Sequence, residues 1–245
     1  MGVLAPRVVI VRRETEFERV RAVYATAASA RFVLERKGLK LEAIEAAHAE
    51  FAAALRHARA AIPSDWRQSI IMRDEIAGFV FGPDDIVVAI GQDGLVANVA
   101  KYLDGQTVIG VDPNPGANAG QLVRFAPADL AAMLPAAAAH RLKLDARVMV
   151  LARLDNGEEL LALNEIFVGH RSHQSARYTL KLGQRSERQS SSGLIVATGT
   201  GATGWAASIL LATRRSLDLT PTAARLGLLV REPWPGPRKI GRAHV

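Results

Sequence analysis

The chain has no cysteine among its 245 residues. This absence excludes disulfide bonds, thiolate metal sites and cysteine nucleophiles. The sequence also lacks any apolar run long enough to span a membrane. Its first residues, Met1-Gly2-Val3-Leu4-Ala5-Pro6, are too few for the hydrophobic region of a signal peptide. We therefore expect a cytoplasmic globular protein that has no membrane partner.

A concentrated basic segment is missing as well, although the formal net charge is +7. The arginines are scattered among alanines, whereas nucleic-acid binding is typically indicated by basic runs with interleaved aromatic residues. We therefore expect no nucleic-acid partner and a solvated surface that attracts anionic nucleotides. Hydrophobic residues make up 49% of the chain and charged residues 22%, so it can bury the core of one large or two small domains.

The first half of the chain alternates short apolar runs with helical segments. The apolar runs are typical of buried parallel strands and comprise Arg7–Val11, Gln68–Met72, Ile86–Ile90 and Thr107–Val111. Between the first two runs, apolar residues recur every three or four positions from Leu41 to Ile62, which predicts a helix that ends before Pro63. The alternation predicts an α/β domain with a parallel sheet over residues 1–130.

The second half has the pattern of a β-rich domain. Asp155-Asn156-Gly157 separates the apolar runs Arg147–Leu154 and Glu159–Val168, and Asn-Gly between two such runs predicts a hairpin. Apolar and polar residues alternate over Ala176–Leu182, which predicts a strand with one solvent-exposed face. We expect a β-sandwich-like domain over residues 131–232 and a tail over 233–245.

The end of the tail has an unusual sequence. Ile240-Gly241-Arg242-Ala243-His244-Val245 is the peptide obtained when a common short-read sequencing adapter is translated in frame. We expect that the native sequence departs from this record near Arg238 and continues, so that strands of the β-rich domain are absent. The alternative is an ordinary polar tail, which the prolines 233, 235 and 237 would also suit. Re-reading the locus from a long DNA fragment distinguishes the two.

The candidate site begins with the loop Gly91-Gln92-Asp93-Gly94, which lies between the predicted strand Ile86–Ile90 and a helical segment near Val96. Glycines allow the backbone to approach a ligand closely, and a helix N-terminus carries partial positive charge. Such a loop can hold phosphate beside a carboxylate. The simpler interpretation is that Asp93 only caps the helix.

Two later segments strengthen the first interpretation. They are Asn164-Glu165, at the end of a hydrophobic strand, and Ser192–Trp205, a strand followed by Gly199-Thr200-Gly201-Ala202-Thr203-Gly204. In this order and spacing, the three motifs resemble the NAD kinase family, which has a Gly-Gly-Asp-Gly loop, an Asn-Glu pair and a Ser-Thr-Pro-Thr-Gly-Ser-Thr-Ala-Tyr segment. The resemblance extends from about Ile86 to Ser208 and concerns motifs rather than continuous sequence.

The resemblance implies an enzyme that phosphorylates the adenosine ribose 2′-hydroxyl of NAD to give NADP. ATP or another phosphoryl donor would be used with magnesium. Asp93 would be the catalytic base, and Gly91 and Gly94 would serve the phosphates. The family also implies a small-molecule nucleotide substrate and a homo-oligomer when the chain is full length. No residue is predicted to bind a metal directly.

The resemblance also implies roles for the later motifs. Asn164 and Glu165 would bind the adenine and ribose, while Thr200, Thr203, Gly204 and Trp205 stand where the family has Thr, Thr, Ala and Tyr. Taken without the resemblance, Asn164 and Glu165 belong equally well to a strand that has reached solvent, and Trp205 to a core. Burying Asn164 and Glu165 is costly unless a partner, such as a ligand, satisfies their polar groups.

Three departures from the family pattern keep other functions open. Gln92 replaces a glycine, Leu95 replaces a threonine, and Ser192 replaces an aspartate that helps to recognise the nicotinamide side of NAD. One alternative is a kinase of another sugar-like or lipid alcohol. A second is a non-catalytic dinucleotide-binding module.

A third alternative is a Rossmann-type oxidoreductase, because Gly199–Gly204 also has the Gly-x-Gly-x-x-Gly spacing and Asp218 falls near the expected acidic position. We rank this interpretation below the kinase, since the fingerprint normally opens a βαβ domain. Two further features are weaker still. Asp112–Gly116 could contact a nucleotide but has turn composition, and His170 and His173 lack a third metal ligand nearby.

Overall fold

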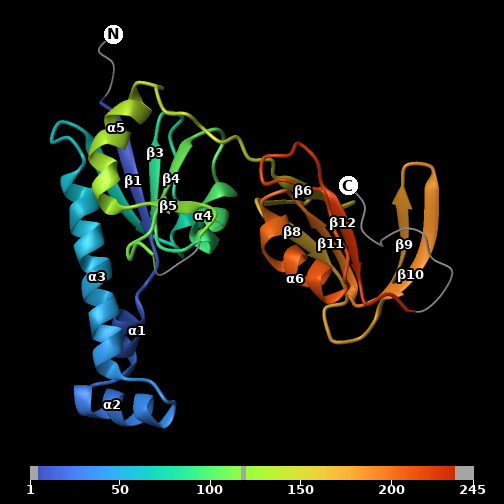
Figure 1. The fold of residues 1–245 in the computed structure, drawn as a ribbon, viewed down its shortest axis with the longest axis horizontal. Helices are drawn as coiled ribbons and strands as arrows, with labels where there is room; N and C mark the ends of the chain where they lie inside the picture. Colours follow the sequence, from blue (N-terminus) through green and yellow to red (C-terminus); the bar gives the residue numbers. More distant parts are fainter. Residues whose placement is uncertain (1–4, 117–119, 235–245) are drawn as a thin grey trace. The chain divides into compact units, whose positions relative to one another are not determined.

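The computed structural model describes residues 5–116 and 120–234. The chain divides into two compact units, Met1–Leu144 and Asp145–Val245 (Figure 1). From the sequence, we placed the division between residues 130 and 131. Most of the predicted tail, including Ile240–Val245, lies outside the described residues. Within the described ranges, none of the helices has the length and apolar content of a membrane span.

The first unit is built on a parallel sheet of five strands in the order β2-β1-β3-β4-β5. Its elements are, in chain order, β1 (Arg7–Arg12), α1 (Glu16–Val23), α2 (Ala27–Arg36), α3 (Leu41–Ala60), β2 (Arg67–Met72), η1 (Ile76–Gly78), β3 (Ile86–Ile90), α4 (Asp93–Ala100), β4 (Thr107–Val111), β5 (Val123–Phe125), η2 (Pro127–Asp129) and α5 (Leu130–Ala138). The predicted parallel α/β architecture is confirmed.

Helices cover both faces of this sheet. On one face, Phe51 of α3 and Leu134 of α5 pack against Val8, Ile10 and other strand residues. On the other face, residues of α4 pack against the alternate side chains of β1 and β3. Because both faces are covered, β3 is buried along its whole length, which explains its continuous apolar sequence.

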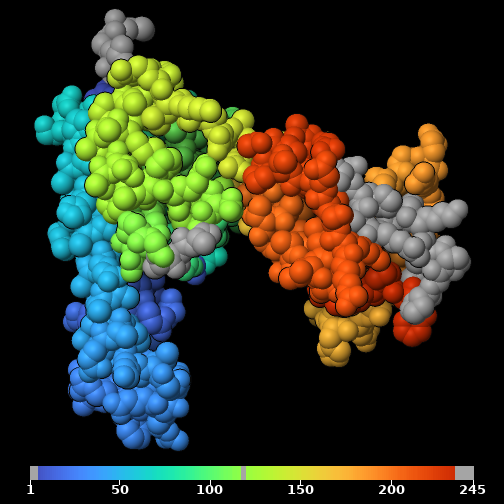
Figure 2. Space-filling model, viewed as in Figure 1, coloured from blue at the N-terminus to red at the C-terminus, as the bar shows by residue number. Residues whose placement is uncertain are grey.

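The N-terminal part of α3 belongs to a smaller cluster with α1 and α2. Val20, Ala30, Leu34 and Leu41 form its buried centre. This helical region extends beyond the body formed around the sheet, as the blue segment in Figure 2 shows. The apolar residues predicted along α3 therefore serve two clusters, one against the sheet and one against α1 and α2.

The second unit consists mainly of antiparallel strands. Its elements are β6 (Val150–Arg153), β7 (Glu159–Ala162), β8 (Glu165–Val168), β9 (Ala176–Leu182), β10 (Arg185–Ser191), β11 (Gly193–Ala197), η3 (Gly201–Thr203), α6 (Trp205–Ala212) and β12 (Gly227–Arg231). They form a three-stranded sheet, β12-β11-β8, and two hairpins, β6-β7 and β9-β10. Helix α6 packs on Ile195, Ala197 and Leu229 of the three-stranded sheet. The β-rich prediction for this half is confirmed.

One predicted strand is wrong in its extent. We expected a single strand over Glu159–Val168, but it is divided into β7 and β8 by Leu163 and Asn164. The carbonyl oxygens of these two residues accept hydrogen bonds from Thr198, from its side chain and its backbone N–H respectively. The break therefore depends on a residue far along the chain, and it allows β8 to pair with β11.

Candidate functional site

The loop Gly91–Gly94 follows β3 at the carboxyl edge of the parallel sheet, the edge at which open α/β sheets bind ligands. The Gly91 N–H donates to the carbonyl of Val111 over 3.0 Å. Gly91 has a φ of 155°, a backbone conformation that favours glycine. Helix α4 begins at Asp93, and its N-cap residue Gln92 makes no side-chain capping bond. The first amides of α4 are thus left without a side-chain cap.

Asp93 does not act as the helix cap that the simpler interpretation suggested. Its carboxylate accepts three backbone N–H groups from the segment leading into β5: those of Gln121 (2.7 Å), Leu122 (2.9 Å) and Val123 (3.0 Å). The bonds from Leu122 and Val123 go to Oδ1, and the bond from Gln121 goes to Oδ2. Because a carboxylate oxygen can accept about two hydrogen bonds, Oδ2 retains one position for another donor.

Gly120 approaches the same carboxylate closely. A Cβ atom at this position would lie 2.7 Å from Asp93 Oδ1 and 2.6 Å from Cγ2 of Val123. Sequence reasoning missed this segment because the donors lie about 30 residues after Asp93 and are backbone N–H groups, which do not depend on the type of side chain. The glycine at position 120 was the one available signal.

The segment after β4 forms a turn of its own. The Asp112 side chain is buried, and its Oδ1 accepts the N–H of Asn114 over 3.0 Å. The Asn114 amide donates in turn to Glu50 of α3 over 2.7 Å. These bonds match the turn composition of Asp112–Gly116.

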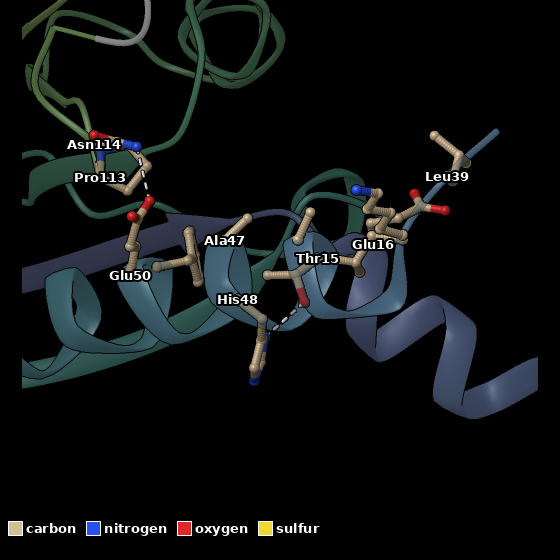
Figure 3. Close-up of a pocket in the computed structure, with 12 residues that line it drawn as sticks. Thr15, Glu16, Leu39, Ala47, His48, Glu50, Pro113 and Asn114 are labelled. Carbon is tan, nitrogen blue, oxygen red and sulfur yellow. Dashed lines mark hydrogen bonds between the residues drawn. The ribbon is translucent and has the colours of Figure 1, made fainter. Parts of the chain in front are cut away.

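A cavity of about 460 Å³ lies beside this turn (Figure 3). Its wall includes Pro113, Asn114, Thr15 and one side of α3 around Ala47 and His48. Thr15 Oγ1 and His48 Nδ1 are 2.8 Å apart, and the dashed lines in Figure 3 mark this bond and the Asn114–Glu50 bond. The size is within the range of small-molecule pockets. The cavity thus lies between α3 and the turn that follows β4.

In the second unit, Thr198 joins the Asn164-Glu165 pair to the glycine-rich loop. Its N–H donates to the carbonyl of Asn164 (2.9 Å), its hydroxyl donates to that of Leu163 (2.5 Å), and the Gly201 N–H donates to its hydroxyl (3.1 Å). Thr198 is completely buried. Sequence reasoning gave it no role, although a threonine between a strand and a glycine-rich loop was a signal.

Two glycines allow this packing. A Cβ atom on Gly201 would lie 2.1 Å from the carbonyl oxygen of Asn164, and one on Gly199 would lie 1.8 Å from that of Thr220. Both are contacts with backbone, which side-chain rotation cannot relieve. The Gly-x-Gly pattern therefore has a structural cause here, which is the close approach of two neighbouring segments.

The predicted threonines in this loop bond to backbone. Thr200 Oγ1 donates to the carbonyl of Pro221 over 3.4 Å, and Thr203 Oγ1 donates to that of Thr200 over 2.8 Å. Gly204 is the N-cap residue of α6 and provides no side-chain cap. Each hydroxyl keeps the ability to accept a hydrogen bond.

Trp205 is not a core aromatic, since 39% of it is exposed. Its ring lies 5.6 Å from that of Phe167 on β8, and the Arg231 guanidinium lies 5.0 Å from its centroid. Phe167 and Arg231 were not among the predicted site residues. Together the three side chains form a partly exposed aromatic and cationic surface next to the glycine-rich loop.

Asn164 and Glu165 contain buried polar atoms that lack partners. Among the described residues, neither Oδ1 of Asn164 nor Oε2 of Glu165 has a hydrogen-bond partner, and neither atom reaches solvent. Burial also raises the pKa of the Glu165 carboxyl above its ordinary value. Buried polar atoms are normally satisfied, so these two atoms are candidates for contact with a ligand.

The Rossmann interpretation does not fit the strands around Gly199–Gly204. Strand β11 pairs antiparallel with both β8 and β12, whereas the dinucleotide fingerprint lies in a parallel βαβ unit. Asp218 lies outside the strands, and 93% of its side chain is exposed. The spacing of the glycines is thus explained by the close packing of this loop.

The described residues contain no group of three or more His, Asp or Glu side chains arranged to hold a metal ion. His170 lies in an exposed loop, where its Nδ1 is 2.9 Å from the hydroxyl of Ser172.

Comparison with known proteins places these motifs in context. No family model matches the chain. A NAD kinase of Burkholderia vietnamiensis (strain G4 / LMG 22486) is 32% identical over 131 residues, which are 51% of this chain and 43% of that protein. The match therefore spans less than half the length of the relative.

Two solved structures have a similar fold. One is a NAD kinase from Archaeoglobus fulgidus in complex with ATP, with a TM-score of 0.54 and 17% identity over 95% of this chain and 75% of that chain. The other is yeast NADH kinase complexed with NADH, with a TM-score of 0.56 and 13% identity over 98% of this chain and 69% of that chain.

A parallel α/β unit followed by a β-rich unit is the two-domain fold of the NAD kinases. The sequence similarity to the Burkholderia protein is a second, separate similarity to the NAD kinases. The chain is thus similar to a NAD kinase in sequence over about half of its length, and it has the fold of two solved NAD(H) kinase structures.

Proposed function

We propose that the protein is a NAD kinase-like phosphotransferase that converts NAD to NADP by phosphorylating the adenosine ribose 2′-hydroxyl. The observation that carries the proposal is the Asn164-Glu165 pair, whose buried Oδ1 and Oε2 atoms have no partner among the described residues and lie beside a glycine-rich loop. Adenine and ribose supply the hydrogen-bond donors that two such oxygens need. The family similarity supports the same substrate class.

Asp93 is the proposed catalytic base. One position on its Oδ2 remains for the proton of the ribose hydroxyl, while backbone donors fix the orientation of the carboxylate. As the proton moves to Asp93, the ribose oxygen bonds to the γ-phosphorus of ATP. The bond from that phosphorus to its bridging oxygen breaks, and ADP leaves.

The uncapped N-terminus of α4 is proposed to hold phosphate. Gly91 and Gly94 place little side-chain bulk near the first amides of the helix, and amides at a helix N-terminus bind anions. Magnesium is proposed to arrive with ATP as part of that substrate, since the described residues provide no cluster of ligands for it. Thr200, Thr203, Gly204 and Trp205 are proposed to contact the nucleotide.

The departures from the family pattern are compatible with this proposal. Leu95 is completely buried in the core beneath α4, so the lost threonine hydroxyl is replaced by packing. Gln92 is exposed at the N-cap and can rotate away from a ligand. Ser192 donates its N–H to the carbonyl of Arg231 over 3.1 Å. Ser192 is therefore bonded to β12, the strand whose Arg231 side chain lies over the Trp205 ring. A cytoplasmic location stays a prediction from the sequence composition, and homo-oligomeric assembly stays a prediction from the resemblance.

The test measures NADP formation from NAD and ATP with magnesium, using the purified protein. Asp93→Asn should lower kcat by about 100-fold or more if Asp93 is the base. Asp74→Asn is the control, because Asp74 is an exposed aspartate of the same unit. Thermal unfolding and NAD binding are measured for each variant, since Asp93 also holds the backbone of residues 121–123.

The possible results separate the alternatives. A folded Asp93→Asn variant that binds NAD and keeps its rate contradicts the base assignment. Binding of NAD without any turnover favours the dinucleotide-binding module. Consumption of ATP only with a different sugar-like or lipid alcohol favours the other kinase class, and a folded protein that does neither contradicts the proposal.

A further inference from the structure

The β9-β10 hairpin has one face packed against the neighbouring sheet. Tyr178 and Leu180 of β9 pack on a cluster of apolar side chains from β11 and β12, formed by Leu194, Leu228 and Val230. Alternate residues of a strand point to opposite faces. The side chains at positions 177, 179 and 181 therefore point away from the sheet.

The outward face of the hairpin carries only cations and hydroxyl groups. Three of its members come from β9 and three from β10, and we call them the cationic face: Arg177, Thr179, Lys181, Ser186, Arg188 and Ser190. Glu187, the one acidic residue of the two strands, pairs with Leu180 on the packed face. The cationic face thus carries three positive charges without an acid of its own.

The register places two arginines close to each other. Arg177 is opposite Ser190, and Arg188 is opposite Thr179, so the arginines are diagonal neighbours. Diagonal neighbours on one face are separated by roughly 7–8 Å. All three cations are exposed, and within the described parts of the chain the side chains of Arg177, Lys181 and Arg188 make neither a hydrogen bond nor an ion pair.

The β6-β7 hairpin of the same unit shows how such a charge is otherwise balanced. There Arg153 lies directly opposite Glu159, and the two side chains form an ion pair at 2.6 Å. On the cationic face, the position opposite each arginine is a hydroxyl residue instead. Neighbouring like charges repel, so this face gains stability from a bound anion.

A hollow in the surface accompanies the charges. A cavity of about 340 Å³ is lined by Arg177, Thr179, Arg188 and Ser190, together with Tyr178 and Gln189. Guanidinium groups bind phosphate oxygens in pairs of hydrogen bonds, and hydroxyl groups can donate further bonds.

We propose that the cationic face is a binding site for a small diphosphate anion, either free pyrophosphate or the diphosphate of a nucleotide. Two guanidinium groups at this spacing suit a ligand with two linked phosphates better than a single phosphate. A nucleic acid is a poorer fit, because Tyr178, the one aromatic residue of the two strands, packs its side chain against the neighbouring sheet rather than on the cationic face, where it could stack with bases. The proposal does not depend on the proposed kinase activity.

The experiment measures binding of pyrophosphate and, separately, of ADP to the full chain by titration calorimetry at low salt without magnesium. The double variant Arg177→Gln/Arg188→Gln should weaken pyrophosphate binding by at least about tenfold. The control Arg185→Gln/Arg171→Gln removes the same charge. Arg185 lies on the opposite face of the hairpin, opposite Leu182, and Arg171 lies in a separate exposed loop. The control variant should bind within about twofold of the unmodified chain.

If Arg177→Gln/Arg188→Gln weakens the binding of both pyrophosphate and ADP, the ligand is the diphosphate of a nucleotide. If it weakens the binding of pyrophosphate alone, the ligand is free pyrophosphate. Equal losses in both double variants would show a general effect of net charge and overturn the proposal. Unchanged pyrophosphate binding in the first variant would overturn it as well. The proposal would also be overturned if the chain bound a single-stranded oligonucleotide more tightly than pyrophosphate, and if only the Arg177→Gln/Arg188→Gln variant weakened this oligonucleotide binding.

Discussion

At the scale of single residues, Glu165 lies in a position where its charged form destabilises the fold. Its Oε2 atom is buried and has no partner in the part of the chain that the structure describes, and burial raises the pKa of its carboxyl. The protonated form is therefore favoured in the folded state. The contribution of this group to stability is complete below its ordinary pKa of 4.5 and is lost as the pH rises through the raised folded value.

Replacement of Glu165 by glutamine should consequently stabilise the protein near neutral pH. In Glu165→Gln, the free energy of unfolding relative to the unmodified chain should increase between about pH 4.5 and about pH 7. We expect a gain on the order of 1 kcal/mol, because burying a neutral amide costs less than burying a charged carboxylate. Urea unfolding at the two pH values measures it. The same variant should bind NAD more weakly if Glu165 makes the proposed contact, because the carboxylate proposed to accept a hydrogen bond from ribose is lost.

Glu158→Gln is the matched control, since Glu158 is an exposed glutamate near the start of β7. Its effect on stability should be the same at both pH values. If Glu165→Gln instead lowers stability at neutral pH, the Glu165 carboxylate makes a stabilising hydrogen bond or ion pair within the protein. The proposed nucleotide contact then loses its main support.

At the scale of secondary structure, much of the arrangement was predictable because its causes are local. The predicted bounds of Ile86–Ile90, Thr107–Val111 and Ala176–Leu182 agree with β3, β4 and β9. Apolar runs between turn residues and strict alternation both act within a few residues. The division of β7 from β8 was not predictable, because Thr198 causes it through hydrogen bonds from 34 residues beyond Asn164.

The same limit applied to the candidate site. Asp93 could be identified as an unusual residue from the nearby Gly91 and Gly94. Its hydrogen-bond partners could not be identified from the sequence. They are backbone amides of residues 121–123, and any sequence supplies backbone amides. Asp93 thereby connects the first turn of α4 with the start of β5, which is a structural role beside the proposed catalytic one.

This connection between α4 and β5 predicts a local effect of Asp93→Ala. The variant leaves three N–H groups without their carboxylate, so the fold should lose on the order of 2 kcal/mol. Amide exchange at Leu122 and Val123 should become at least about tenfold faster. Hydrogen–deuterium exchange of the folded protein measures this, with Asp74→Ala as the control. Unchanged exchange at both amides would contradict the connection.

At the scale of the whole molecule, the chain consists of two units with separate cores. The apolar clusters of the parallel sheet contain only residues before position 144, and those around β11 contain only residues after 145. Helix α5 belongs to the first unit, because Leu130 and Leu134 are completely buried there. From the sequence we placed the boundary after residue 130, which is the first residue of this helix, whereas packing assigns the whole helix to the first unit, which extends to Leu144.

The segment between α5 and β6 is therefore where a protease should separate the two units. Residues 139–149 contain neither helix nor strand, and Arg141 and Lys143 are exposed. Exposed irregular segments are preferred cleavage sites. Brief trypsin treatment should cut first after Arg141 or Lys143, and mass spectrometry should identify two fragments that begin and end there.

The variant Arg141→Gln/Lys143→Gln should slow this first cut by about tenfold or more, because only Arg147, half-buried and paired with Asp145, then remains in the segment. Arg171→Gln is the control, since Arg171 lies in another exposed irregular loop but inside the second unit. Cleavage there should nick the second unit without separating the two cores. If trypsin instead cuts first within α3 or the parallel sheet, the first unit is less stable than its buried clusters imply, and residues 139–149 are not the boundary between independently folded parts.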